Sequence, residues 1–414
     1  MNPIYLLAFS LFFIPLCGPV IIEPIIGVYD LWQAKEFLVI IFISGIALSA
    51  YSAGNHHRAK TNYWLIALML FLPISAFSAP PLKIIYGHEN LAGLWIWRCM
   101  AWAYAYFMAY CAIAANPPVQ DRHKKMIVQA IGWAAIISAG YAYIQALGLD
   151  QWQIARPRSE IWDPAVPHIT AMIGNPTYLA TWLVMCLPFV VLFFAWPWAV
   201  LVFGAVLLCH SDIAVAGSGL TVVFALCLRA RRTIWLKTIL GCVLTIIALI
   251  MANWGEIRPK IHDNGRFAVW AQTFEDWQSP CITIPIHDGM SSAQKADIEK
   301  LNKRTYALTG RGLGSFPYIF SPKYGTKFDS AHNEHLEGPY TIGLIGQGLF
   351  WMTIFFVFLE SFSIAKSDKF TLALYLSLFF CCIAAFGLPI LHIEPLRYFS
   401  ATMFCLLSSL IQRK

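Results

Sequence analysis

Several polar side chains that could do chemistry crowd into one short stretch, AHNEHLEGP, late in the chain. They are His332, Asn333, Glu334, His335 and Glu337. An imidazole with a pKa of about 6.5 can transfer protons at neutral pH, so His332 is a candidate general base. The two histidines could share a helix face, but no third ligand follows at a metal-binding spacing, so we expect no metal. The alternative is that these residues only end a membrane helix at its interface.

The composition predicts that this stretch belongs to a membrane protein. The chain has 414 residues, of which 58% are hydrophobic and only 12% are charged, and its mean hydropathy is +0.61. Average soluble domains carry about 25% charged residues. The net charge of +7 is confined to short clusters between apolar runs, which indicates membrane topology and not nucleic-acid binding.

Apolar runs predict an all-α polytopic membrane protein, because a spanning helix needs about 20 mostly apolar residues. We expect about twelve transmembrane helices. They lie near residues 4–22, 37–53, 61–79, 92–115, 126–147, 178–195, 197–210, 212–228, 233–252, 339–364, 370–391 and 396–411.

The distribution of charge predicts the orientation of these helices. The basic connections read GNHHRAK, NPPVQDRHKK, RARR and AKSDK, and the C-terminus reads QRK. Such segments stay in the cytoplasm. We therefore expect both termini there, with nine helices over 1–252, a large outside loop with short amphipathic helices over 253–338, and three helices over 339–414.

Two segments of the large loop are informative. The stretch 265–277 has aromatic residues at helical spacing and predicts an amphipathic helix on the membrane surface. These are Phe267, Trp270, Phe274 and Trp277. Arg266 would share a face with Trp270 at the depth of lipid phosphates, where it could bind a diphosphate or simply a headgroup. The stretch 310–322 is rich in glycine and proline and is expected to be a loop.

The dipeptide Gly338-Pro339 predicts where the following span begins. The residue before a proline avoids the α region, and proline favours the first helical position. We expect the span to begin at Pro339, with the polar cluster in a separate turn or short helix capped by Asp329 or Ser330. The polar groups could then line a wet cavity outside the hydrocarbon.

Four segments, in order, resemble the O-antigen ligase family, whose core domain is shared with O-antigen polymerases and bacterial O-oligosaccharyltransferases. They are GNPTYLATWL (174–183), GRFAVW (265–270), GRGLGSF (310–316) and HNEHLEGPYTIGLIG (332–346). The resemblance implies a GT-C-like architecture in the bacterial inner membrane. It also implies an inverting glycosyltransferase, without metal or cofactor, that acts on the periplasmic face.

The resemblance also implies roles for particular residues. His332 would be the base, Arg266 a diphosphate ligand and Asn333 an orienting group. The family's Ser-Arg-Gly segment corresponds here to AGSGLTVV (216–223), which has no arginine. Arg158 and Arg311 are the hypothetical substitutes. The candidates for a supporting role are Trp270, Glu334 and His335.

The function implied is transfer of a polysaccharide from a polyprenyl diphosphate carrier to lipid A-core. Its partners would be that donor, lipid A-core or another glycan acceptor, and the lipid bilayer, with no nucleic acid. The alternatives are an O-antigen polymerase and a protein O-oligosaccharyltransferase. A polysaccharide transporter or flippase is a further alternative, although the two halves of the chain do not match as transporter halves often do.

Overall fold

The computed structural model describes eleven segments of the chain. They cover residues 3–16, 38–46, 63–78, 91–115, 120–150, 169–219, 266–278, 291–299, 306–316, 331–385 and 394–411, apart from 172, 174, 212–213, 293–294, 297–298, 314 and 332. Every regular element in these segments is a helix. The expectation of an all-α protein is confirmed for the described part of the chain.

The main helices follow the predicted apolar runs. Their bounds are α1 (Pro3–Leu16), α4 (Tyr63–Ser78), α6 (Leu91–Ala115), α7 (Asp121–Ala146), α8 (Pro176–Phe193), α9 (Trp196–Leu208), α13 (Arg266–Gln278), α16 (Glu334–Ala365), α17 (Lys369–Ala384) and α18 (Glu394–Ile411). Residues 38–46 and 214–219 are also helical. The predicted span 233–252 lies outside the described residues. Among the described helices, three (α7, α8 and α16) are long and apolar enough to cross a membrane, and the total of about twelve stays a prediction.

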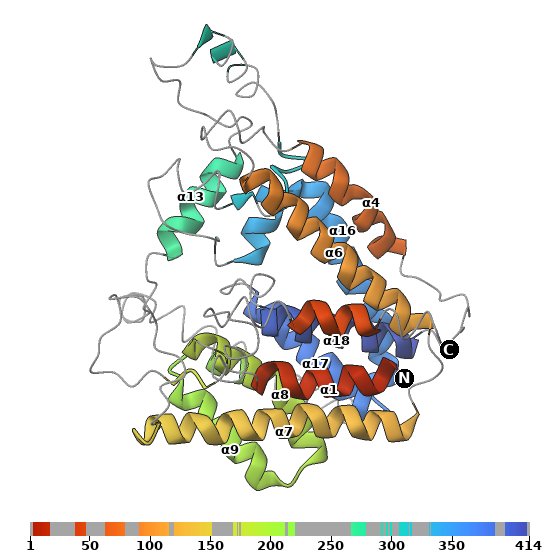
Figure 1. Ribbon diagram of the computed structural model, residues 1–414, viewed down its shortest axis with the longest axis vertical. Coiled ribbons are helices and arrows are strands. Elements are labelled where there is room, and N and C mark those ends of the chain that lie inside the picture. The colour runs from red at the N-terminus through yellow and green to blue at the C-terminus, as the bar shows by residue number, and fades with distance from the viewer. Residues whose placement is uncertain are drawn as a thin grey trace, which may run out of the picture.

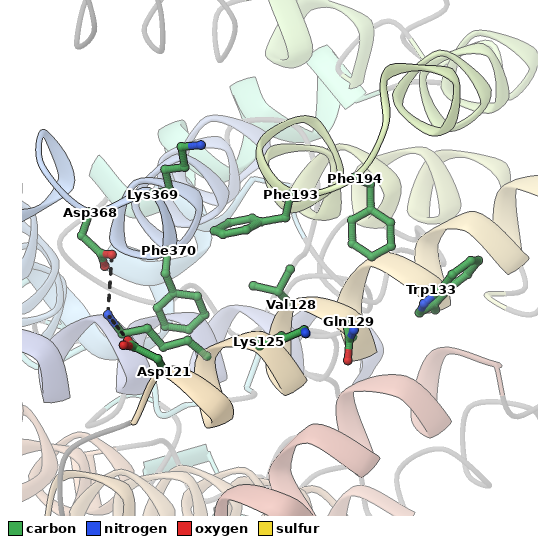
Figure 2. A pocket seen from close by; sticks show the side chains of 11 residues that line it. Asp121, Lys125, Val128, Gln129, Trp133, Phe193, Phe194, Asp368, Lys369 and Phe370 are labelled. Carbon is green, nitrogen blue, oxygen red and sulfur yellow. Dashed lines mark ion pairs between the residues drawn. The ribbon is translucent and has the colours of Figure 1, made fainter.

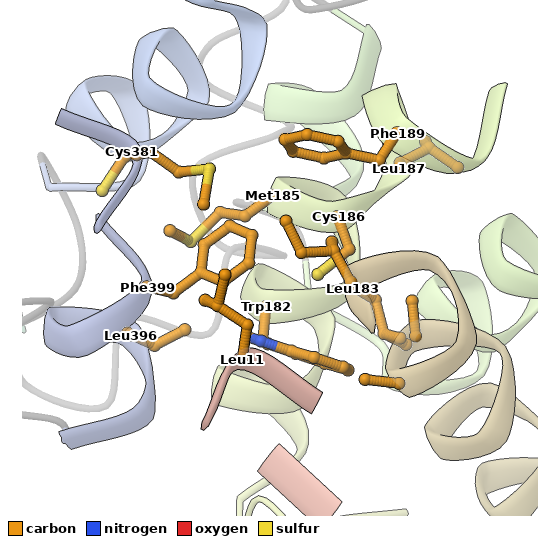
Figure 3. Close-up of a cluster of buried hydrophobic side chains, with 14 of the residues drawn as sticks. Leu11, Trp182, Leu183, Met185, Cys186, Leu187, Phe189, Cys381, Leu396 and Phe399 are labelled. Atoms are coloured by element: carbon orange, nitrogen blue, oxygen red, sulfur yellow. The ribbon is translucent and has the colours of Figure 1, made fainter. Parts of the chain in front are cut away.

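The helices pack as a bundle of two groups, α1, α7, α8, α9 and α17 in one and α4, α6, α13 and α16 in the other, with α18 in contact with both (Figure 1). α8 contacts α7, α9, α17 and α18, while α4 packs against α16 and α6, and α13 packs beside the start of α16. Trp182, Met185 and Phe189 of α8 are fully buried, with Met185 near Cys381 of α17 and Phe399 of α18 and Trp182 near Leu11 of α1 (Figure 3). Small residues allow close approach, which is how helices associate in lipid. For example, the Phe194 ring packs directly against Gly132 of α7.

α8 begins two residues before the predicted start of the span at 178. Asn175 is the N-cap, and its side-chain oxygen accepts hydrogen bonds from the backbone N–H groups of Thr177 and Tyr178, at 2.9 and 3.4 Å. Pro176 occupies the first turn, where its missing N–H costs nothing. Asn175 and Pro176, which lie in the segment GNPTYLATWL, therefore open a buried helix.

α16 does not begin where its sequence predicts. It starts at Glu334 with Asn333 as N-cap, so the predicted start at Pro339 and the predicted caps Asp329 and Ser330 are wrong. The helix continues through Pro339 and breaks instead at Gly343, where φ is 70° and ψ is 177°. Only glycine adopts this conformation readily, and this freedom decides where the break lies.

The break at Gly343 folds α16 back on itself. The rings of His335 and Trp351 stack with centroids 4.7 Å apart, although sixteen residues of straight helix would separate them by about 24 Å. Residues 344–365 rise about 33 Å, which is enough to cross a bilayer. A separate short helix, 334–342, therefore carries Glu334, His335 and Glu337, as expected in kind but with the boundary moved.

The connections gather at the two ends of the bundle. At one end, Lys124 near the start of α7 pairs with Asp368 in the loop before α17, at 3.5 Å. At the other end, Gln145 accepts hydrogen bonds from the backbone of Thr170 and Ala171, at 2.9 and 2.7 Å. About 36 Å of α7 separates Gln145 from its first turn. The two basic segments NPPVQDRHKK and AKSDK thus supply residues that meet at one end.

Candidate functional site

Three of the predicted site residues cannot be placed as side chains. His332 and Arg158 lie outside the described residues. Arg266 is the first residue of α13, but its side chain is also outside the described part. The amphipathic helix that was expected to carry Arg266 is confirmed as α13.

The backbone directly before His332 is fixed by two helices. The indole nitrogen of Trp270, on α13, donates to the carbonyl of Ala331 at 2.9 Å. The amide of Ala331 donates to the carboxylate of Glu337, on α16, also at 2.9 Å. Both Ala331 and Glu337 are buried, so water competes little for these bonds. Trp270 thus contacts the residue before His332, and its supporting role in the site stays a prediction.

The backbone directly after His332 is fixed by the N-cap of α16. Asn333 is buried, and its side-chain oxygen accepts from the amides of His335 and Leu336, at 3.0 and 3.3 Å. That oxygen forms the N-cap of the helix, and an N-cap side chain typically contributes about 1 kcal/mol to stability. Asn333 therefore holds the start of α16, and its orienting role in the site stays a prediction.

α13 contacts the protein through residues outside its aromatic stripe as well as through Trp270. Val269, Thr273 and Asp276 are its buried residues, at three- and four-residue spacing. Phe274, which belongs to the predicted aromatic stripe, remains exposed. The helix is thus fixed to α16 on one side and leaves an aromatic residue uncovered on another.

The described part of the glycine-rich segment, within 310–316, is mainly loop, and together with residues 307 and 308 it supplies the hydrogen bonds that the broken α16 lacks. The amides of Arg311 and Gly312 donate to the carbonyls of Tyr340 and Thr341, at 3.2 and 2.8 Å. In return, the amides of Leu344 and Ile345 donate to the carbonyls of Ala307 and Leu308, at 2.9 and 3.2 Å. Because buried backbone groups must be paired, the loop and the break require each other.

Glycine is needed at both contact points. A Cβ on Gly343 would lie 2.2 Å from the carbonyl oxygen of Leu308, and one on Gly310 would lie 2.2 Å from that of Thr341. Both glycines also have positive φ, of 70° and 72°. The two glycine-containing segments of the family resemblance are thus in direct backbone contact.

Arg311 lies in the interior of this cluster. Its side chain is 2% exposed, and its guanidinium carbon lies 4.1 Å from the centre of the Tyr340 ring. One terminal nitrogen donates to the carbonyl of Asp276, on α13, at 3.0 Å. Its Nε has no hydrogen-bond partner in the described part of the chain. Arg311 therefore joins α13, the glycine-rich loop and α16 through one planar group.

Glu334 and His335 face α17. The amide of Glu334 donates to the carbonyl of Ala385 at 2.9 Å. The His335 ring stacks on Trp351 and hydrogen-bonds to the backbone of Cys382. Both residues therefore connect the short helix to the bundle, and the described contacts give neither a separate chemical role.

Sequence reasoning left Glu337 without a role and did not single out Asp276 or Tyr340. The contacts of these three residues join segments that are distant in sequence or, for Glu337, reach back six residues to Ala331, so no local pattern indicates them. Within the described residues, no three His, Cys, Asp or Glu side chains are grouped to hold a metal ion.

Comparison with known proteins gives no match. No protein-family model matches the chain, and no curated protein is significantly similar to it. The resemblance to the O-antigen ligase family therefore depends on the four segments, and it stays a prediction.

Proposed function

We propose that the protein is an inner-membrane glycosyltransferase of the O-antigen ligase type. It would move a glycan from a polyprenyl diphosphate carrier to an acceptor hydroxyl, with lipid A-core as the leading acceptor. The observation that carries the proposal is the arrangement around position 332. Buried polar groups fix the backbone on both sides of this histidine, and the same cluster contains a buried arginine.

The reaction assigned to these residues is a direct displacement. His332 takes the proton from the acceptor hydroxyl, whose oxygen forms a bond to the anomeric carbon. The bond from that carbon to the diphosphate breaks, and its electron pair leaves with the polyprenyl diphosphate. Attack from the opposite face inverts the anomeric centre. No metal or cofactor takes part.

Arginines would stabilise the charge that develops on the leaving diphosphate. Arg266, Arg158 and Arg311 are the candidates named from the sequence. Arg311 is best suited to stabilise this charge from a distance, without touching the diphosphate. Its cation is buried near Tyr340, and electrostatic interactions are stronger in a low-dielectric interior. Arg266 remains the candidate for direct bidentate contact.

The proposal is tested in a deletion strain of the source bacterium, with lipopolysaccharide analysed on gels. Ligase activity predicts loss of the polysaccharide ladder and accumulation of lipid-carried polymer. Collapse to a single repeat would instead indicate a polymerase. A normal ladder with unglycosylated protein would indicate a protein transferase. A normal ladder with normally glycosylated protein would contradict all three transferase functions.

The base assignment is tested by complementing that strain. His332→Ala should lower transfer by a factor of about 10² to 10⁴, which is the usual contribution of a general base. His210→Ala is the matched control, because His210 is exposed in the turn after α9. Immunoblots of membranes confirm equal insertion. Full ladder formation by His332→Ala would overturn the assignment.

A further inference from the structure

A cavity of about 510 Å³ lies at the end of the bundle where α7 and α17 begin (Figure 2). The first turns of α7, the end of α8 and the start of α17 line it. Residues 344–365 of α16, about 33 Å of helix, separate this end from the Gly343 break. The cavity is therefore distinct from the cluster around His332, and its volume is typical of ligand sites.

The polar side of the cavity contains lysines that are not paired with its carboxylates. Lys124 pairs with both carboxylates, at 3.8 Å from Asp121 and 3.5 Å from Asp368. Lys125 and Lys369 also line the cavity, from α7 and α17, and form no ion pair with any described residue. Two exposed ammonium groups thus remain for an anion.

The other side of the cavity is apolar and open to the surroundings. Its lining includes Val128, Trp133, Phe193, Phe194 and Phe370. Trp133 and Phe193 are 43% and 41% exposed, so they face outward, where lipid would lie. Lys125, Gln129 and Trp133 follow one another at four-residue spacing on α7, so they share one helix face, and about 12 Å of helix rise separates Lys125 from Trp133.

We propose that this cavity binds an anionic phospholipid. The phosphate would lie between Lys125 and Lys369, and the first part of an acyl chain would lie along Trp133 and Phe193. A free phosphate would leave the apolar wall without a partner, and a neutral lipid would leave the two lysines without one. Basic pockets between transmembrane helices bind anionic headgroups in this way. The proposal depends on the helices lying in a membrane and not on the transfer reaction.

The test measures lipid binding to the purified full-length protein in mild detergent by native mass spectrometry. The probes are dioleoyl phosphatidylglycerol and dioleoyl phosphatidylcholine, and glycerophosphoglycerol as a headgroup without chains. Lys125→Gln with Lys369→Gln should raise the Kd for phosphatidylglycerol roughly 10- to 30-fold. Gln129→Trp, which fills the cavity without removing a charge, should also weaken this binding.

Two controls separate this site from general charge attraction and from catalysis. Lys366→Gln removes a lysine from the same loop, but Lys366 lies over the Phe362 ring at 4.1 Å and does not line the cavity. This variant and His332→Ala should both keep the wild-type Kd. Equal binding of the two lipids, an equal effect of Lys366→Gln, or full competition by glycerophosphoglycerol would each overturn the proposal.

Discussion

The two ends of the bundle differ in how far their charged side chains are exposed. Near Gly343, Arg311, Asp276 and Glu337 are each 2 to 3% exposed. At the other end, the Lys124–Asp368 pair is partly exposed, at 25 and 33% of the two side chains, and the Asp121 side chain is fully exposed. One end thus fixes its polar groups before any ligand arrives, whereas the other leaves lysines in contact with the surroundings.

The difference shows which interactions each end depends on. Backbone hydrogen bonds between the glycine-rich loop and α16 hold the buried end, and they fail together if the two segments separate. Exposed ion pairs are usually worth 1 kcal/mol or less each, so the other end tolerates change. We therefore expect substitutions near Gly343 to affect folding and transfer together, and substitutions near Lys124 to have small effects.

The largest effect is expected from Gly343→Ala. The added Cβ would meet the Leu308 carbonyl at 2.2 Å in a conformation that only glycine adopts readily. We expect the free energy of unfolding to fall by about 3 kcal/mol and transfer to be lost with it. Thermal unfolding in detergent and ladder formation measure the two effects.

Gly348→Ala is the matched control for that change. Gly348 lies in α16 with nothing within 4 Å of an added Cβ, so alanine should leave stability unchanged or raise it by up to about 1 kcal/mol. If both variants unfold at the same temperature, the loop and the break do not depend on each other.

A smaller effect is expected from Arg311→Lys. Lysine keeps the charge but loses the planar group that stacks on Tyr340 at 4.1 Å and reaches Asp276. We expect a loss of about 2 kcal/mol of stability, measured as the midpoint of thermal unfolding. We also expect Arg311→Lys to lose a larger fraction of transfer activity than Gly348→Ala loses. Wild-type stability and transfer would remove Arg311 from the site.

The smallest effect is expected from Asp368→Ala, at the exposed end. Asp368 caps α17, where its carboxylate accepts from the amide and hydroxyl of Thr371 at 3.0 and 2.6 Å. We expect a loss of about 1 kcal/mol at pH 7. Asp368→Asn should lose less, because asparagine keeps the cap and removes only the partner of Lys124.

The same carboxylate predicts a dependence on pH. Burial alone would raise the pKa of Asp368, but the hydrogen bonds from Thr371 and the charge of Lys124 outweigh it and lower that pKa. The lowered pKa contributes stability above the unfolded value of about 3.9, and this contribution is lost as pH falls through the native value. The difference between wild type and Asp368→Asn should therefore shrink below about pH 4. A difference that is constant from pH 7 to pH 3 would contradict this assignment.

Local patterns predicted much of the helical architecture. Hydropathy located the described helices within a few residues, and Asn175-Pro176 marked the start of α8, because capping depends only on neighbours in sequence. The prediction from Gly338-Pro339 was wrong because it also used only neighbouring residues. A local rule predicted a break there, but the break moved to Gly343, where a loop from thirty residues earlier supplies the missing hydrogen bonds.

The sequence by itself determined the helical class, the apolar lengths, the grouping of basic segments and the presence of polar residues at one helix start. Only the tertiary structure decided that α16 folds back at Gly343, that Arg311 is buried against Tyr340, and that Glu337 and Trp270 hold Ala331. The reason is physical. Helix formation and capping depend on nearby residues, whereas pairing the backbone groups of a broken helix requires partners that are brought close only when the bundle packs.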